Sequence, residues 1–273
     1  MAVPVYPIRR AKSKGERHSV GPISMSTRVL LEVCVASVDD AVAAVAAGAD
    51  RLELNTALSL GGLTPSAGLF AEVRRRVSVP IIAMVRPRSG GFCYSEADFE
   101  VMLRDADAFL AAGADGLAFG VLSSDGEIDT DRCRKLRDVC GRRDIVFHRA
   151  FDVTPDPFAA LETLVRLGFT RVMTSGQAAS AIAGADLIAA IVAAAGGRIE
   201  LLPAGGINGA NAAALLARTR CNQVHASVRG IVRDPSVAAR PGVRFGAPSL
   251  PPEGEFDRTD GAAVAALRSA LGG

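Results

Sequence analysis

From residue 29 onward, short β-rich apolar segments alternate with longer segments of helical periodicity. Each short segment except the last is followed at once by a helical one. The predicted strands are residues 29–36, 51–55, 80–86, 117–121, the apolar opening of 144–152, 171–175, 199–204 and 223–228. The predicted helices are residues 38–47, 64–77, 95–112, 129–141, 157–167, 186–195, 208–218 and 262–271.

Eight strand–helix units predict one α/β domain folded as a closed TIM (β/α)8 barrel. A doubly wound open sheet is the runner-up, but the turn after the first predicted strand, CVASVDD, lacks the glycine typical of that fold. The barrel domain is expected over residues 28–273, with a long irregular loop at 229–259 before the last helix. Residues 1–27 are basic and carry Pro and Gly, and we expect a disordered extension there.

Composition narrows the possible partners. The formal net charge of +2 is too small to indicate nucleic-acid binding. No apolar run approaches the roughly 20 residues of a membrane-spanning helix. The 5 cysteines are scattered and form no CxxC pair, which favours reduced thiols in the cytoplasm.

Polar side chains gather where the predicted strands end. The segment DIVFHRAFD runs from an apolar strand directly into His148, Arg149 and Asp152. A buried strand has no structural need for these groups at its carboxyl end, and that end carries the chemistry in TIM barrels. The other candidates at strand ends are Glu32, Cys34, Glu53, Asn55, Arg86, Ser175, Gly205, Gly206 and His225.

This set is compatible with acid–base chemistry on a small anionic molecule. In that hypothesis Arg86 and Arg149 hold a carboxylate or phosphate, and Glu32 or Glu53 is the general base. His148 donates a proton, with Asp152 or His225 beside it. Purely structural alternatives stay open, such as a buried Glu53–Arg86 ion pair.

The turn after the seventh predicted strand, PAGGIN, is the expected anion subsite. Gly205 and Gly206 would let backbone N–H groups approach an oxyanion, and Ser175 and His225 complete this expected ligand site. A tight turn that simply requires glycine is an equally open alternative. No lysine lies at a strand end, which argues against Schiff-base aldol chemistry.

Taken together, the motifs LEVCVAS, DRLELN, SLGGLTPS, MVRPRSGGFCYS, DGLAFGVLSSDGEID, FHRAFD, TSGQAAS and AGGIN resemble the CutC copper homeostasis protein family. The resemblance runs from about residue 29 to 271, and it includes the late segment RFG…EFDRTD. It implies a cytoplasmic TIM barrel, often oligomeric, that binds Cu(I). On this basis we expect a homo-oligomer, with a dimer favoured, and no organic cofactor.

The resemblance also implies particular metal ligands. In some family members copper ligation is attributed to a cysteine of the EVCV motif, here Cys34, together with a cysteine at the end of the second strand. That second position is Asn55 in this chain. Cu(I) prefers thiolate and thioether ligands, so Cys93 is the candidate for a second thiolate, and Met84 is expected to belong to the core. Three functions stay open at this point: Cu(I) binding in copper homeostasis, an isomerase or lyase acting on a small anion, and a non-catalytic ligand-buffering oligomer.

Overall fold

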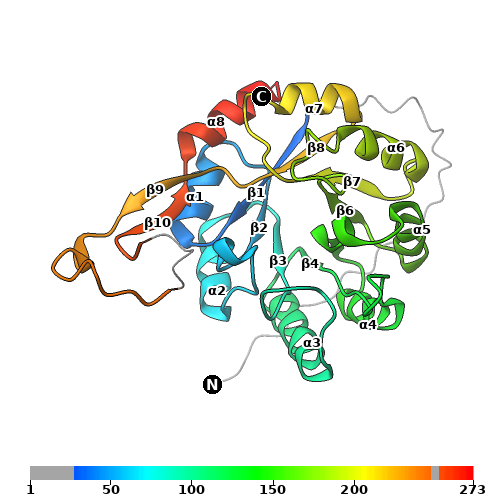
Figure 1. The fold of residues 1–273 in the computed structure, drawn as a ribbon, viewed down its shortest axis with the longest axis horizontal. Coiled ribbons are helices and arrows are strands. Elements are labelled where there is room, and N and C mark those ends of the chain that lie inside the picture. The colour runs from blue at the N-terminus through cyan, green and yellow to red at the C-terminus, as the bar shows by residue number, and fades with distance from the viewer. Residues whose placement is uncertain (1–27, 247–251, 273) are drawn as a thin grey trace, which may run out of the picture.

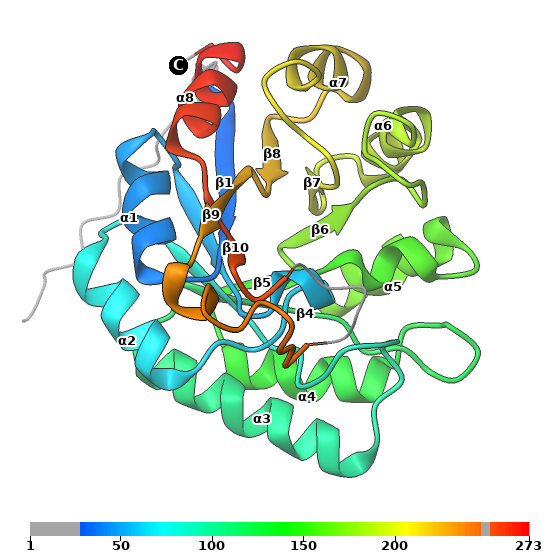
Figure 2. The ribbon, with the colours of Figure 1, turned by 60° about the vertical axis from the view of Figure 1, so that its left-hand side comes forward.

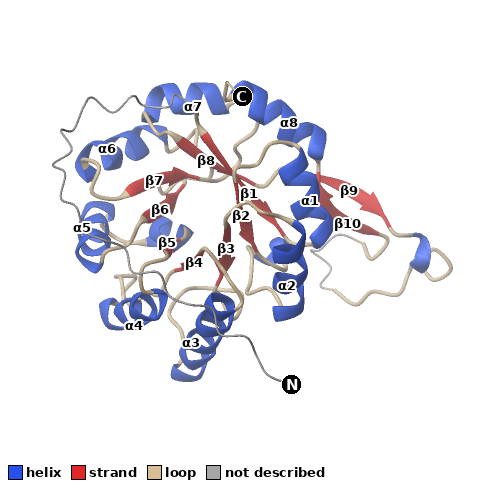
Figure 3. Cartoon of the chain, turned by 180° about the vertical axis from the view of Figure 1, so that it is seen from behind, coloured by secondary structure: helices blue, strands red, loops and turns tan. Residues whose placement is uncertain are grey.

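The computed structural model describes residues 28–246 and 252–272 of the chain. The extension expected at residues 1–27 lies outside them. Eight parallel strands form one sheet in the order β7-β6-β5-β4-β3-β2-β1-β8. A parallel bridge between Ala204 and His225 brings β7 back to β8 and closes the barrel. The helices surround the strands as an outer ring (Figures 1 and 3). The TIM (β/α)8 barrel prediction is therefore confirmed.

The elements follow the predicted alternation. The barrel strands are β1 Leu30–Val35, β2 Arg51–Leu54, β3 Ile81–Met84, β4 Gly116–Phe119, β5 Asp144–Phe147, β6 Arg171–Thr174, β7 Glu200–Pro203 and β8 Gln223–Ala226. The helices are α1 Val38–Ala46, α2 Ala67–Arg76, α3 Glu96–Ala111, α4 Thr130–Cys140, α5 Pro157–Leu167, α6 Ala185–Ala195, α7 Ala212–Thr219 and α8 Gly261–Ala270. None of these helices has the length and apolar character needed to cross a bilayer.

Local sequence sets several helix starts. The Ser37 side chain accepts a hydrogen bond from the backbone of Asp40, which caps α1. Ser95 and Asp98 form a reciprocal capping box at the start of α3. The start of α2 differs from expectation, because Ser66 rather than the Thr64-Pro65 pair is the N-cap.

The segment after β8 also differs from the predicted irregular loop. It contains an antiparallel pair of strands, β9 Arg229–Arg233 and β10 Glu255–Thr259. This ribbon extends from the barrel beyond α1 (Figure 1) and comes forward in the turned view of Figure 2. Four of its large apolar side chains are exposed: Ile231, Val243, Phe245 and Phe256. The Pro and Gly content that suggested an irregular stretch belongs largely to the connection between the two strands.

The barrel interior holds a layer of paired charges at the amino ends of the strands. Its members, called here the lower ionic layer, are Glu32, Arg51, Asp144, Arg171, Glu200 and Gln223. Arg51 donates to Glu32 and, at 2.9 Å, to Gln223. Gln223 donates to Glu200 at 3.1 Å. Arg171 completes the chain by donating to Glu200 at 3.0 Å and to Asp144 at 3.1 Å.

An apolar layer lies above the paired charges inside the barrel. It is a cluster of small and medium side chains contributed by several strands: Ile82, Met84, Ala118, Val146, Met173, Leu202 and Ala204. A larger apolar core fills the space between the strands and the helices. The polar side chains at the carboxyl ends of the strands therefore sit on a packed interior, which fixes their positions.

Candidate functional site

The carboxyl ends of the strands surround a cavity of about 470 Å³. Its size is in the range of small-molecule sites. The residues predicted from the sequence that line it are Cys34, Glu53, Asn55, Arg86, His148, Arg149, Asp152, Gly205, Gly206 and His225. Glu32 and Ser175 are not among its lining residues, and neither is Cys93.

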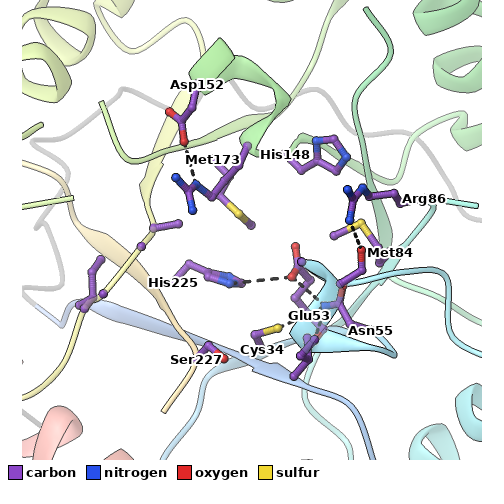
Figure 4. A pocket seen from close by; sticks show the side chains of 18 of the residues that line it. Cys34, Glu53, Asn55, Met84, Arg86, His148, Asp152, Met173, His225 and Ser227 are labelled. Atoms are coloured by element: carbon purple, nitrogen blue, oxygen red, sulfur yellow. Dashed lines mark hydrogen bonds and ion pairs between the residues drawn. The ribbon is translucent and has the colours of Figure 1, made fainter. Parts of the chain in front are cut away.

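Four buried side chains form a polar cluster on one wall of this cavity (Figure 4): Cys34, Glu53, Asn55 and His225. The Asn55 amide donates to Glu53 Oε2 at 2.8 Å and to Cys34 Sγ at 3.3 Å. His225 Nε2 lies 3.8 Å from Glu53 Oε2. One possible ligand atom each from Cys34, Glu53 and His225 lies within 4.8 Å of the others. The sequence supplied these residues separately, as a metal ligand, a base and an anion contact, but not as one cluster.

Burial and mutual charge shift the pKa values in this cluster. Burial, reinforced by the neighbouring Glu53 charge, raises the pKa of the Cys34 thiol well above its usual value. Burial also raises the pKa of Glu53, because the stabilising effect of His225 only partly offsets it. For His225, burial alone would lower the pKa, but the carboxylates of Glu53 and Glu32 raise it overall.

Glu32 lies below this cluster and anchors it. Burial disfavours its charge, yet Arg51 and the hydrogen bond with His225 lower its pKa well below the usual range. An ionised carboxylate can only accept, so His225 Nδ1 donates to Glu32 Oε1 at 2.8 Å. Its Nε2 then faces the cavity wall formed by Cys34 and Glu53. Such a low pKa makes Glu32 a poor general base, and its position makes it a support for His225.

Arg86 holds the loops at the cavity mouth. Its Nη1 donates to the carbonyl oxygens of Leu60 at 3.0 Å and Gly62 at 2.9 Å, and its Nη2 donates to Gly90 at 2.8 Å. The guanidinium also lies 5.3 Å from the centre of the Phe92 ring. Only Nε is buried without a partner. Most of its donors are therefore used to fasten backbone, which leaves few for the anion that the sequence assigned to it.

His148 is neutral and offers one free ring nitrogen. Burial and the positive charge of Arg86 lower its pKa to about 3. Its Nδ1 accepts from the backbone N–H of Ala150 at 3.2 Å, so the proton resides on Nε2. That Nε2 is buried and has no partner. The ring packs against Phe92, with 5.0 Å between the ring centres, rather than against Asp152 or His225 as the acid–base hypothesis required.

Asp152 is turned toward the end of β6 by the short helical turn η2, Arg149–Val153. Its carboxylate accepts from the Thr174 hydroxyl at 2.5 Å and from the Ser175 hydroxyl at 2.9 Å. The Ser175 backbone N–H and Arg149 Nε also donate to it, at 3.0 and 2.8 Å. Asp152 is thus saturated with donors, and its visible role is to join β6 to η2.

The other candidate sulfur ligands differ in whether they reach the cavity. Cys93 is exposed, so the expected second thiolate does not lie at the cluster. Met84 and Met173, by contrast, both line the cavity (Figure 4). Sequence reasoning placed Met84 in the core and did not single out Met173. Both occupy inward-facing strand positions, and that alternation is the signal that could have found them.

Comparison with known proteins supports the family resemblance seen in the sequence motifs. The CutC family model matches residues 29–230. A CutC family protein of Treponema denticola is 48% identical over 229 residues, covering 84% of this chain and 93% of its own length. The human copper homeostasis protein cutC homolog is 44% identical over 219 residues, which is 80% of each chain.

Solved structures support the same relationship. The putative copper homeostasis protein CutC of Streptococcus agalactiae has a TM-score of 0.68 and 31% identity. It covers 72% of this chain and 97% of its own. Phosphoribosylanthranilate isomerase of Thermotoga maritima, at 16% identity and a TM-score of 0.54, shares the barrel fold alone. From its motifs, its family match and its relatives, this chain belongs to the CutC family.

Proposed function

We propose that the protein acts in copper homeostasis by binding one Cu(I) ion at the Cys34–His225 wall of the cavity. The relatives whose names refer to copper homeostasis support this function. The observation that carries it is the arrangement of Glu32, His225 and Cys34. A metal-ligating histidine usually donates its other ring N–H to a carboxylate, which orients the free nitrogen toward the metal. His225 makes that contact with Glu32 at 2.8 Å.

The donor set suits a soft ion better than a hard one. Cys34 supplies a thiolate when deprotonated and His225 an imidazole nitrogen. The Met84 and Met173 thioethers, which also line the cavity, are further soft donors within the same mouth. Glu53 is the hard member of the cluster, and its partner in this proposal is the Asn55 amide, which donates to it at 2.8 Å. All 5 cysteines are free thiols, which fits a reducing, cytoplasmic location as part of the proposal.

The acid–base alternative receives less support from the geometry. Asp152 is saturated, Arg86 clamps backbone carbonyls, and Glu32 is held ionised by Arg51. Glu53 and His148 retain unpartnered atoms in the cavity, but they contact no common partner that would mark a proton relay. The cavity can therefore bind a small molecule, but its side chains do not form an arrangement that would catalyse a reaction of that molecule.

The copper proposal is tested by titrating reduced protein with Cu(I) against a chromophoric chelator. Wild-type protein should bind one equivalent, and Cys34→Ser should weaken binding by about a hundredfold or more because it removes the only cavity-lining thiol among the described residues. Cys133→Ser is the matched control. Cys133 is equally buried, but it contacts the carbonyl of Val121 away from the cavity. Weak wild-type binding, or equal binding by both variants, would sink the copper assignment.

Proton release provides a second readout of the same site. The pKa values of Cys34 and His225 are both raised, whereas the metal requires the thiolate and the neutral imidazole. Apparent Cu(I) affinity should therefore increase with pH, by about tenfold per pH unit for each proton displaced. Affinity that does not change between pH 6 and 8 would show that these two groups do not ligate the metal.

A further inference from the structure

The turn that follows β7 presents unused backbone donors to the cavity. The N–H of Ala204 donates to Thr174, and that of Asn208 donates to the Asn211 side chain. Between them, the N–H groups of residues 206 and 207 donate to no acceptor within the described part of the chain, whereas the Gly205 N–H faces β8 where the Ala204–His225 bridge closes the barrel. Gly205 and Gly206 adopt φ values of 108° and 71°, and all three residues line the cavity. Successive free N–H groups in a turn form a concavity suited to an anion.

Arg149 adds positive charge at the same place. A Cβ atom added to Gly205 would lie 3.7 Å from Arg149 Nη1, so the guanidinium lies over the open face of that glycine. Its Nε is held by Asp152 and its Nη2 by the Ser175 hydroxyl, at 2.8 Å each. Nη1 has no partner among the described residues. The arginine is thus fixed by two contacts while one end stays available to a ligand.

Asp152 offsets part of the charge of Arg149, but both of its oxygens are occupied by donors. Its carboxylate oxygens are already engaged by Arg149, Thr174 and Ser175. Two backbone N–H groups, of residues 206 and 207, and the arginine Nη1 are then left without an acceptor among the described residues, and all three residues line the cavity. A phosphate group presents three terminal oxygens to such a set, whereas a carboxylate presents two, so phosphate matches these donors better.

Other lining residues offer buried hydrogen-bonding atoms that have no partner. His148 Nε2, a donor, is buried without a partner, and so are the acceptors Glu53 Oε1 and Asn55 Oδ1. Their side chains point toward the cavity (Figure 4). Each residue is at most 4% exposed, so an unmet hydrogen bond at these atoms is costly. Hydroxyl groups, which both donate and accept, would satisfy all three.

We propose that the cavity binds the phosphate ester of a small polyhydroxylated molecule. The phosphate lies between Arg149 and the N–H groups of residues 206 and 207, and the hydroxyls meet Glu53, Asn55 and His148. The cavity of about 470 Å³ accommodates a molecule of this size. The phosphate end shares no residue with the copper donors Cys34 and His225, so this site stands or falls separately from the copper proposal.

The first test uses metal-free wild-type protein and requires no variant. Glycerol 3-phosphate is titrated into deuterated, ¹⁵N-labelled protein at constant ionic strength, with glycerol, acetate and sulfate as comparison solutes. The proposal expects saturable shifts of the backbone amides of residues 206 and 207 at one equivalent, strongest with the phosphate ester. Shifts that are scattered over surface arginines, or equal for sulfate and the phosphate ester, would mean an adventitious ion only and would overturn it.

The second test measures affinity by calorimetry. Arg149→Gln should weaken glycerol 3-phosphate binding by about tenfold or more, because it removes a charge-assisted contact. Arg198→Gln is the control. Arg198 has a similarly exposed side chain, 44% against 45%, and also pairs with one carboxylate, but it lies outside the cavity. Equal affinities of the two variants contradict the proposal, and the amide shifts of the wild type decide the matter should Arg149→Gln fail to fold.

Discussion

The barrel contains two polar layers, and they differ in how completely they are paired. In the lower ionic layer every residue contacts another member, and Arg171 Nη1 is the one buried side-chain atom without a partner. At the carboxyl ends of the strands, four lining residues each keep a buried unpartnered atom: Glu53, Asn55, Arg86 and His148. Buried polar groups are normally satisfied. A saturated layer therefore indicates structure, and an unsaturated layer indicates a ligand.

Glu32 connects the two layers. One of its oxygens accepts from Arg51 in the lower layer, and the other accepts from His225 at the cavity. The lower ionic layer thereby sets the orientation of His225 at the cavity. This contact joins the two layers directly, since the lower-layer residues do not line the cavity.

The largest effect should come from breaking the lower layer at this connection. Arg51→Met leaves the Glu32 carboxylate, which is 1% exposed, without its main cation. We expect unfolding free energy to fall by about 3–5 kcal/mol. Arg171→Met is the matched comparison, because its partners Asp144 and Glu200 have side chains 40% and 57% exposed. Those carboxylates stay hydrated, so the loss should be about 1 kcal/mol.

Urea unfolding at neutral pH distinguishes these two variants. A difference of several kcal/mol between them supports the view that Glu32 depends on Arg51. Similar losses would mean that the layer stabilises the barrel as a uniform network, and Glu32 would then have no special place in it.

A smaller effect concerns the two histidines of the cavity, whose contributions to the free energy of unfolding should change with pH in opposite directions. His148 has a folded pKa of about 3 against an ordinary 6.5, so the unfolded chain takes up the proton first as the pH falls. Its stability contribution is complete above pH 6.5 and declines by about 1.4 kcal/mol per pH unit toward pH 3. His148→Gln should therefore unfold with a flatter acid limb.

His225 has a raised pKa, so its contribution has the other sign. It is fully present below the unfolded value of 6.5 and is lost as the pH rises through the folded pKa. His225→Gln should lose stability relative to wild type mainly at acidic pH. Melting temperatures measured from pH 4 to 8 check both variants, and parallel curves for the two would contradict the assigned protonation states.

Much of this molecule could be predicted from local sequence. The barrel follows from repeated strand–helix units, and Ser37 and Ser95 identify helix starts by their capping chemistry. Because side chains alternate along a strand, Glu32 shares one face of β1 with Cys34, and Glu53 of β2 shares one face with Asn55, which follows that strand. These features depend on residues close together in the chain, where spacing determines geometry.

The pairing of polar groups could not be predicted in this way. Glu32 meets His225 because β1 and β8 are neighbours in a closed barrel, with those two residues in register. Arg86 is occupied by carbonyl groups of two loops, and Asp152 is turned aside by a short helical turn. Each outcome depends on barrel closure or loop conformation, so sequence reasoning assigns a charge at a strand end to chemistry even where that charge serves the fold.

The smallest predicted effect is a change in Cu(I) affinity on substitution of Asn55. Its amide nitrogen lies 3.3 Å from Cys34 Sγ, so this residue occupies the position from which a second thiolate would reach the same ion. Asn55→Cys should raise Cu(I) affinity by about tenfold, or about 1.4 kcal/mol, because a second soft ligand replaces an amide. Asn55→Ser removes the same amide without adding sulfur and should not raise affinity. If the two variants bind Cu(I) equally, the ion does not lie beside Cys34 within reach of position 55, and the proposed copper site is contradicted.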